Sequence, residues 1–251
     1  MLSKNKTKLI QSLGSKKYRQ KYNKFIVEGH KTCIEFIKSG KYEITDIIAY
    51  DEWSVDNKDI IEKRGLTITI IPPAEMKTIT HFSTPSPVVL ICEIPEKEEI
   101  GISDLQKIIY LDDIQDPGNL GTIIRIADWF GIQAILTSIG TVDKFNPKVI
   151  SGSMGSFINV PVLTDYGNLM EEITGSHSFI GADMNGKEFS SFKFPEKSVL
   201  CMGNEGHGLS SALITKINDF VSIPGSPGKI ADSLNVSMAA AILCASWKTR
   251  D

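Results

Sequence analysis

Three short segments of small and polar residues, each beside an apolar run, constrain this chain most. They are residues 119–125, residues 203–208 and residues 233–237. The last of them leads directly into an Ala-rich apolar stretch, residues 238–244. A small polar run at the start of a helix offers hydroxyl, amide and backbone N–H groups to a ligand. The sequence therefore predicts a ligand site built from three loops at the ends of secondary-structure elements.

Strand-like apolar runs alternate with amphipathic helical stretches along the chain, which predicts an α/β fold. The charged stretch 95–99 divides this alternation. We expect a small α/β domain at 1–95, a linker at 96–106, and a doubly wound domain with a parallel sheet at 107–251. The expected strands are 25–28, 44–50, 66–71, 88–94, 107–112, 134–137, 179–182, 199–202 and 220–223, and the expected helices are 5–22, 29–38, 57–64, 73–81, 118–130, 147–154, 210–216 and 235–248.

Positive charge is concentrated at the start of the chain. Before Glu28 there are eight lysine or arginine residues and no acid, although the formal net charge of the whole chain is -3. Tyr18 and Tyr22 are interleaved with these cations. A solvated helix face is the ordinary interpretation of such a run. The acidity of the remaining chain favours a local phosphate-binding patch instead.

The cysteines and the hydropathy pattern bear on location. Four cysteines are scattered through apolar surroundings, with neither disulfide nor zinc spacing. They are expected to be buried thiols in a reducing compartment, so a cytoplasmic location and no bound metal are predicted. No apolar run approaches the roughly 20 residues that span a bilayer, and the basic N-terminus is not followed by the apolar core of a secretory signal. We expect no association with membranes.

Taken together, in this order and at these spacings, the three segments resemble the motifs of the SpoU/TrmH family of RNA ribose 2′-O-methyltransferases, within the SPOUT class. The resemblance is close over about the C-terminal 60% of the chain and loose over the rest. Residues 25–29 and 83–88 resemble the substrate-binding domain often fused ahead of such enzymes, although Ser86-Pro87 departs from the usual Gln-Gly. Residues 146–155 match a further family segment, in which Ser151 replaces the usual arginine.

The resemblance implies a trefoil-knotted C-terminal domain, S-adenosylmethionine as the methyl donor, and roles for individual residues. Arg125 takes the place of the catalytic arginine, and Glu205 orients Arg125 or Asn119. Ser233 and Asn235 face the ribose and the reactive methyl group. The expected cofactor-binding residues are Thr137, Met202, Gly203, Asn204, Gly208, Ile223 and Leu234.

Each of these residues also has an ordinary structural interpretation. Arg125 can pair with Asp128, Glu205 can face water in a turn, and Ser233 can cap a helix. Asn119 and Arg125 are six residues apart, so both can reach one site only if Asn119 belongs to the loop. The position of His207 varies in the family, and we interpret it as incidental.

The implied reaction is attack of a ribose 2′-hydroxyl on the sulfonium methyl carbon. Family proposals give the proton to the arginine, yet an arginine side chain is effectively always protonated. We therefore hypothesise that Arg125 anchors the adjacent phosphate and lowers the pKa of the hydroxyl, while Ser233 or a water relays the proton.

The expected partners are RNA and a second copy of the chain. The expected RNA contacts are Lys16, Lys17, Arg19 and Lys24. The expected dimer faces are the apolar residues Ile123, Ile124 and Ile126 and the stretch 238–247. Ribosomal RNA is the expected substrate. The alternatives are transfer RNA and a non-catalytic RNA-binding dimer. A nucleotide-dependent oxidoreductase would need a glycine fingerprint that this sequence lacks.

Overall fold

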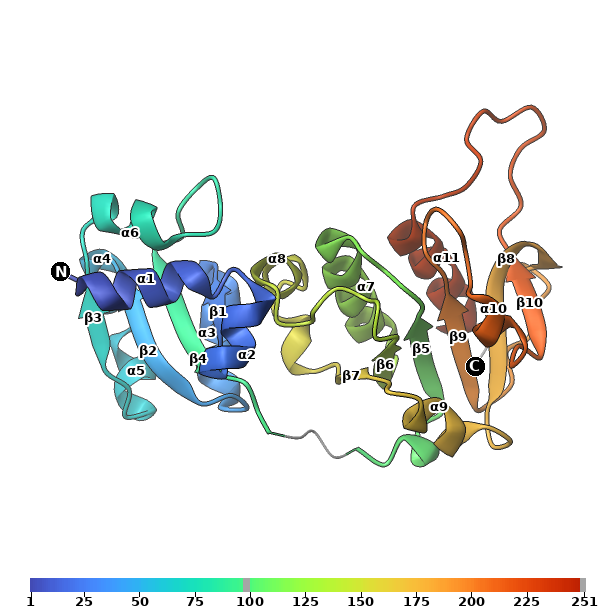
Figure 1. Ribbon diagram of the computed structural model, residues 1–251, viewed down its shortest axis with the longest axis horizontal. Coiled ribbons are helices and arrows are strands. Elements are labelled where there is room, and N and C mark those ends of the chain that lie inside the picture. The colour runs from blue at the N-terminus through green and yellow to red at the C-terminus, as the bar shows by residue number, and fades with distance from the viewer. Residues whose placement is uncertain (97–99, 249–251) are drawn as a thin grey trace. The chain divides into compact units, whose positions relative to one another are not determined.

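Apolar strands and amphipathic helices alternate along the chain as predicted, and they gather into two units (Figure 1). The computed structural model describes residues 1–96 and 100–248. One unit comprises Met1–Lys97 and Asp143–Ile158, and the other comprises Glu98–Val142 and Asn159–Asp251. The expected linker, 96–106, includes residues 97–99, which lie outside the described part of the chain. Beyond them, Ile102–Asp104 forms a 3₁₀ turn (η1) in which Ile102 is buried.

The first unit is built on a four-stranded mixed sheet. The strand order is β1-β4-β2-β3, in which β4 runs antiparallel to β1 and β2, and β3 runs parallel to β2. Apolar side chains of the sheet and of the helices α1 and α6 form one buried cluster, which includes Ile26, Met76 and Val89. The elements are α1 (Lys4–Ser12), α2 (Lys16–Tyr22), β1 (Lys24–Glu28), α3 (His30–Ser39), β2 (Ile44–Ala49), α4 (Asp51–Asp56), α5 (Lys58–Lys63), β3 (Ile68–Ile70), α6 (Pro73–Ile79) and β4 (Val88–Glu93).

The single helix expected over residues 5–22 was wrong, because the chain breaks there into α1 and α2. Ser15 is the N-cap residue of α2, and the bend before it leaves backbone carbonyls that α1 does not use. Nη1 of Arg19 donates to two of them, the carbonyls of Leu13 and Gly14, at 2.8 and 2.9 Å. A left-handed Asn23, with φ 51°, then ends α2 and turns the chain into β1.

Residues 143–158 pack with the first unit, although the expected domain boundaries place them in the second. They form α8 (Pro147–Gly152) and a 3₁₀ turn η2 (Ser156–Ile158). Phe145 and Phe157 are buried against Phe25 and Phe36, with ring centroids 4.7 Å apart for the Phe25–Phe145 pair and 6.4 Å apart for Phe36–Phe157. The first unit therefore completes its aromatic core with residues that lie far along the chain.

The second unit contains a six-stranded parallel sheet of order β10-β8-β9-β5-β6-β7, which confirms the predicted α/β class. Its strands β5, β6 and β9 are apolar and almost wholly buried, as a central parallel sheet requires. Two short elements, β7 and α9, were not predicted. The elements are β5 (Lys107–Leu111), α7 (Pro117–Phe130), β6 (Ala134–Thr137), β7 (Val162–Thr164), α9 (Asn168–Ile173), β8 (Ser178–Glu188), β9 (Ser198–Met202), α10 (Ser211–Ile214), β10 (Asp219–Ser222) and α11 (Val236–Lys248).

The helices α7 and α11 pack against each other, and both begin beside polar loops. Asp116 caps α7 by accepting a hydrogen bond from the N–H of Asn119 at 2.9 Å, and Pro117 occupies the first helical position. Among the described residues, no helix is long and apolar enough to cross a membrane. All four cysteines are free and buried.

Candidate active site

The three polar segments singled out in the sequence are joined in the second unit by side-chain hydrogen bonds. Asn119, from the first segment, donates from Nδ2 to Oε1 of Glu205, from the second, at 2.5 Å. Asn235, from the third segment, donates from Nδ2 to Oδ1 of Asn119 at 3.0 Å. Both ends of the Asn119 amide are thereby used, which fixes its orientation. Residues up to 116 positions apart meet at this one place.

Asn119 lies in the first turn of α7 and not in the preceding loop. Arg125 follows it in the same helix, so the two side chains leave the helix in different directions. Arg125 is exposed, and no hydrogen bond or ion pair links it to another described residue. Within this single chain, the structure brings Asn119, Glu205 and Asn235 together but leaves Arg125 outside their hydrogen-bond network.

The second segment forms a tight hairpin after β9. Asn204 and Gly208 exchange backbone hydrogen bonds of 2.9 and 3.0 Å, and the N–H of Gly206 donates to Oδ1 of Asn204. A Cβ at Gly203 would lie 2.3 Å from the carbonyl carbon of Gly208, so only glycine lets the two sides approach this closely. Gly208 has φ +70°, which glycine adopts without strain. The hairpin presents Glu205 to solvent at its tip.

Asp113 connects this hairpin with two other loops, a role that the sequence analysis did not foresee. It follows β5, and its backbone is left-handed, with φ 58°. Its carbonyl accepts from Nδ2 of Asn204 at 2.8 Å, and its N–H donates to Oγ of Ser138 at 2.8 Å. Its carboxylate accepts from Nε2 of Gln115 at 2.6 Å and lies 3.2 Å from Nε2 of His207. The sequence feature that could have indicated this role is an acidic residue close after a buried strand.

The third segment caps the last helix. Oδ1 of Asn235 accepts from the N–H and Oγ of Ser237, at 2.9 and 2.6 Å, so Asn235 both begins α11 and holds Asn119. Ser233 and Leu234 are exposed. They belong to the connection between β10 and α11, which projects away from the rest of its unit (Figure 1). No hydrogen bond to another described residue places Ser233 in the network.

The expected cofactor-binding residues fall into two groups. Thr137 and Met202 are buried and pair in register with Leu111 from its two sides, so they lie at the same edge of the sheet. Gly203, Asn204 and Gly208 continue from there as the hairpin. Ile223 and Leu234 lie on the exposed connection after β10, and no hydrogen bond between described residues joins their side chains to the first group.

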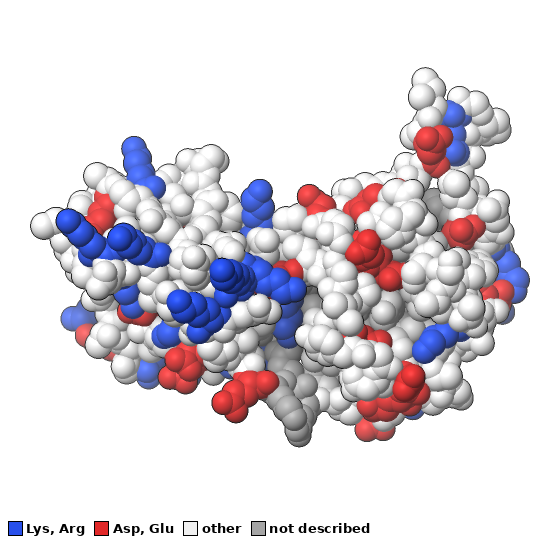
Figure 2. Space-filling view, in the orientation of Figure 1, with Lys and Arg blue, Asp and Glu red and all other residues white. Residues whose placement is uncertain are grey.

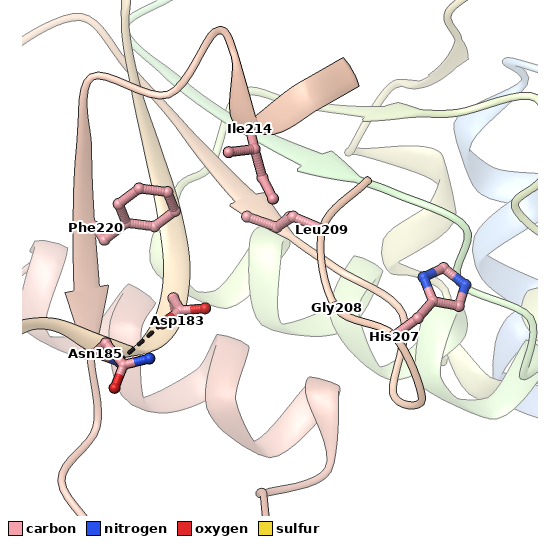
Figure 3. Close-up of a pocket in the computed structure, with 7 residues that line it drawn as sticks. All are labelled: Asp183, Asn185, His207, Gly208, Leu209, Ile214 and Phe220. Carbon is pink, nitrogen blue, oxygen red and sulfur yellow. Dashed lines mark hydrogen bonds between the residues drawn. The ribbon is translucent and has the colours of Figure 1, made fainter. Parts of the chain in front are cut away.

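One cavity of about 310 Å³ opens beside the hairpin (Figure 3). Leu209, Ile214 and Phe220 form its apolar side, while Asp183 and Asn185 form a polar rim on β8. His207 and Gly208 line it from the hairpin. Nε2 of His207 also lies 3.2 Å from Oδ2 of Asp113. Of the expected cofactor-binding residues, only Gly208 lines this cavity.

Two buried groups in the sheet, Tyr110 on β5 and Cys201 on β9, are poor proton acceptors. Burial, with Asp165 and Asp112 nearby, raises the pKa of Tyr110 above its ordinary value. Burial, with Asp112 nearby, raises the pKa of the Cys201 thiol. Both groups therefore stay neutral at physiological pH. Within the described ranges, no cluster of three or more His, Cys, Asp or Glu side chains could hold a metal ion.

Of the four expected RNA contacts, Arg19 is placed where it cannot reach a ligand. It is 2% exposed, and Nε and Nη2 donate to Oδ2 of Asp143 at 2.8 and 2.5 Å. The prediction for Arg19 was therefore wrong, because the buried guanidinium makes four hydrogen bonds inside the first unit. Lys24 is half-buried and donates to Oγ1 of Thr45 at 2.9 Å. Lys16 and Lys17 are exposed on α2.

Comparison with known proteins gives a consistent result over the whole chain. The model of the SpoU rRNA Methylase family matches residues 106–245, and that of the MRM3-like substrate binding domain matches residues 4–90. The chain is 32% identical to the 23S rRNA (guanosine(2553)-2'-O)-methyltransferase RlmP of Bacillus subtilis, over 95% of this chain and 94% of that protein.

Two solved structures are similar over nearly their full lengths. One is a putative RNA methyltransferase of the TrmH family from Porphyromonas gingivalis, with 30% identity, a TM-score of 0.85 and complete coverage of both chains. The other is an AdoMet-bound rRNA methyltransferase from Sinorhizobium meliloti, with 26% identity, a TM-score of 0.84, and coverage of 98% of this chain and 95% of that one.

Proposed function

Because this chain belongs to the SpoU rRNA Methylase family, we propose that it transfers a methyl group from S-adenosylmethionine to a ribose 2′-hydroxyl of structured ribosomal RNA. The observation that carries the proposal is the Asn235–Asn119–Glu205 chain of hydrogen bonds, because it unites all three motifs. The similarity to a 23S rRNA 2'-O-methyltransferase supports the ribose and the ribosomal RNA. The matched substrate-binding domain at residues 4–90 also favours ribosomal over transfer RNA.

The residues present fit the methyl donor in their chemistry. When bound, S-adenosylmethionine supplies a methyl group carried on a positively charged sulfur. The hairpin 203–208 offers backbone groups unobstructed by side chains at Gly206 and Gly208. The buried ends of β6 and β9, at Thr137 and Met202, and the exposed Leu234 would complete the binding surface. The trefoil knot implied by the sequence resemblance is part of this proposal.

The chain's own polar residues would orient the hydroxyl. Glu205 and Asn235 hold the amide of Asn119 from both sides, which keeps it rigid beside the proposed ribose position. Glu205 retains a second carboxylate oxygen for a further contact. Arg125 would anchor a phosphate next to the target nucleotide. Ser233 or a water would relay the hydroxyl proton to bulk solvent, because a protonated arginine side chain cannot accept it.

We propose that the active form is a homodimer in which Arg125 completes the site of the partner. Arg125 lies on the same face of α7 as Trp129, which is 83% exposed, and Met238 on the adjacent α11 is 56% exposed. Such an apolar surface favours a second copy. Several of the dimer residues named from the sequence are buried inside the chain: Ile123, Ile124, Ala240, Leu243, Cys244 and Trp247. The dimer surface proposed here is therefore smaller than the one expected from the sequence. The buried free thiols fit a reducing compartment, and we propose the cytoplasm.

Methylation by the purified protein tests this function. The protein would be incubated with labelled S-adenosylmethionine and either protein-free 23S rRNA, ribosomal particles or bulk tRNA, and modified riboses would be mapped by their resistance to alkaline cleavage. We expect one site in ribosomal RNA, and we expect Asn119→Ala to abolish the signal. Transfer to tRNA alone would overturn the substrate assignment. Calorimetric binding of RNA without any binding of S-adenosylmethionine would indicate a non-catalytic RNA-binding protein.

A further inference from the structure

The helix α2 has two faces with opposite tasks. Arg19 points inward and is held by Asp143 and by the carbonyls of Leu13 and Gly14. Lys17 and Lys21 are two residues before and after Arg19, so both side chains leave the helix on the side roughly opposite Arg19 and point away from the core. Because Arg19 fixes the rotation of the helix, the outer face is presented in one orientation.

Two partly exposed tyrosines form a stacked pair on one flank of α2, between the direction of Arg19 and that of the two lysines. Tyr18 and Tyr22 are one helical turn apart, and their ring centroids are separated by 6.2 Å with an interplanar angle of 14°. They are 37% and 40% exposed. The ammonium of Lys17 lies 5.9 Å from the Tyr18 ring centroid, and that of Lys21 lies 5.3 Å from the Tyr22 centroid. This flank and the lysine side, together called the outer face of α2, thus form a short aromatic ladder with a cation over each ring.

The charge on this face fits a polyanion. The helix contains no acid, and no carboxylate in the described part of the chain forms an ion pair with Lys16, Lys17 or Lys21. Figure 2 shows Lys and Arg side chains gathered over the helices α1 and α2. Lysines alone would bind phosphates. An exposed aromatic ring binds a different part of a nucleic acid, because it stacks on the face of a base. A base inside a duplex has both faces covered by its neighbours, so only an unpaired nucleotide can use such a ring.

We propose that the outer face of α2 binds unpaired nucleotides of the RNA substrate, with Tyr18 and Tyr22 stacked on bases and Lys17 and Lys21 at the phosphates. This inference rests on the proposed function, since it names the part of the ribosomal RNA that the first unit contacts: a loop, bulge or single strand. Arg19, which the sequence suggested as an RNA contact, is in this proposal the residue that fixes the orientation of the helix.

Binding of labelled oligoribonucleotides to the full-length protein, measured by fluorescence anisotropy, tests the inference. A single strand and a duplex of equal length would be compared at several salt concentrations. The Tyr18→Ala/Tyr22→Ala protein should bind the single strand at least roughly tenfold more weakly, with little change for the duplex. Tyr18→Phe/Tyr22→Phe should bind as the unaltered protein does, because the ring face is kept. Tyr166→Ala, which removes an exposed tyrosine from the second unit, is the matched control.

The lysines give a second, independent signature. Lys17→Ala/Lys21→Ala should weaken binding of both RNAs and lower the salt dependence of binding by about two phosphate contacts. Two results would overturn the inference: an unchanged affinity of Tyr18→Ala/Tyr22→Ala for the single strand, or failure of the unaltered protein to bind any single strand. An equal loss of affinity for the duplex and the single strand in Tyr18→Ala/Tyr22→Ala would also overturn it, because it would indicate a surface that contacts phosphates only.

The two proposals fail in different ways. If the unaltered protein methylates ribosomal RNA while the tyrosine variants bind and methylate it equally well, the assignment of α2 is wrong and the enzymatic function stands. If the unaltered protein binds single-stranded RNA through these tyrosines but never binds S-adenosylmethionine, the RNA surface stands and the enzymatic function is wrong. Equal urea midpoints for all variants would show that each has folded.

Discussion

Arg19 and Asp143, which are 124 positions apart in the chain, form a bonded pair in which Nε and Nη2 of the guanidinium share one carboxylate oxygen. The pair closes the first unit around a segment from the middle of the sequence. It also explains why the most buried cation of the basic N-terminal run is not available to a ligand.

Removal of one partner from this pair should be costly. Arg19→Met leaves the half-buried carboxylate of Asp143 and the carbonyls of Leu13 and Gly14 without their donor, so the free energy of unfolding should fall by about 3 kcal/mol. Urea denaturation followed by circular dichroism measures the change. The control is Lys38→Met, which breaks the exposed Glu35–Lys38 pair and should cost less than about 1 kcal/mol. Similar losses for the two variants would contradict the structural role of Arg19.

Glu205 should act through charge as well as through its hydrogen bond to Asn119. Glu205→Gln keeps an oxygen that can accept from Asn119 Nδ2, whereas Glu205→Ala removes the acceptor and frees the amide. We expect the alanine variant to lose roughly 100-fold in the rate of methyl transfer and the glutamine variant to lose less. Single-turnover kinetics with ribosomal RNA separate this loss from product release. Equal rates for both variants would show that Asn119 does not depend on Glu205.

The hairpin after β9 should tolerate a methyl group at one glycine and not at another. In Gly203→Ala the new Cβ would meet the backbone of Gly208 and Leu209 within 2.4 Å, so the hairpin must open. In Gly206→Ala the nearest atom is Asn204 Oδ1, at an ordinary 3.4 Å. Calorimetry should show S-adenosylmethionine binding weakened at least about tenfold in the first variant and nearly unchanged in the second. The reverse order would exclude the hairpin as the cofactor site.

Arg125 should serve catalysis without giving up its proton. Arg125→Lys keeps the charge but loses the planar, two-pronged contact with a phosphate, so we expect a lower rate at every pH and an unmoved alkaline limb. The pH–rate profiles of the two proteins measure this. A lysine variant with a near-native rate and a shifted alkaline limb would favour the arginine as the base.

Stability of the first unit should depend on the protonation of His81. Nδ1 of His81 lies 3.1 Å from Oε1 of the buried Glu28, and this hydrogen bond raises the pKa of His81. The stabilisation is fully present below about pH 6.5, the ordinary pKa of histidine, and is lost as the pH rises through the raised value. His81→Gln should therefore lower the free energy of unfolding more at about pH 5.5 than at about pH 8.5. Urea titrations at both pH values measure it, and a pH-independent loss would contradict it.

The parts of the fold that the sequence predicted well are those set by local pattern. The strand β6 and the helix α7 follow from an apolar run and from Asp116-Pro117 at a helix start, signals that lie within a few residues. The break between α1 and α2 does not, because it depends on Arg19 binding carbonyls behind it and Asp143 far ahead. The aromatic core was also missed, since Phe145 and Phe157 reach Phe25 and Phe36 only in three dimensions.

The candidate site also has features that the sequence predicted and features that it did not. The meeting of Asn119, Glu205 and Asn235 was expected from the family resemblance, and the hydrogen bonds agree with it. The expected helix 118–130 already contained Asn119, and its place in α7 rules out the loop position that a shared site with Arg125 in one chain requires. The contacts of Asp113 with three loops were not expected. A left-handed backbone at an aspartate leaves little trace in a sequence, because the residue tolerates several turn conformations.

The chain enters the first unit twice, and this has a consequence for biosynthesis. A nascent polypeptide that ends before residue 143 has neither Phe145 nor Phe157 to fill its aromatic core, nor the carboxylate that neutralises Arg19. The N-terminal unit therefore cannot finish folding when its own first hundred residues leave the ribosome. It must wait until β5, α7 and β6 have been translated and residues 143–158 have followed them, so completion of the first unit is coupled to synthesis of the first part of the second.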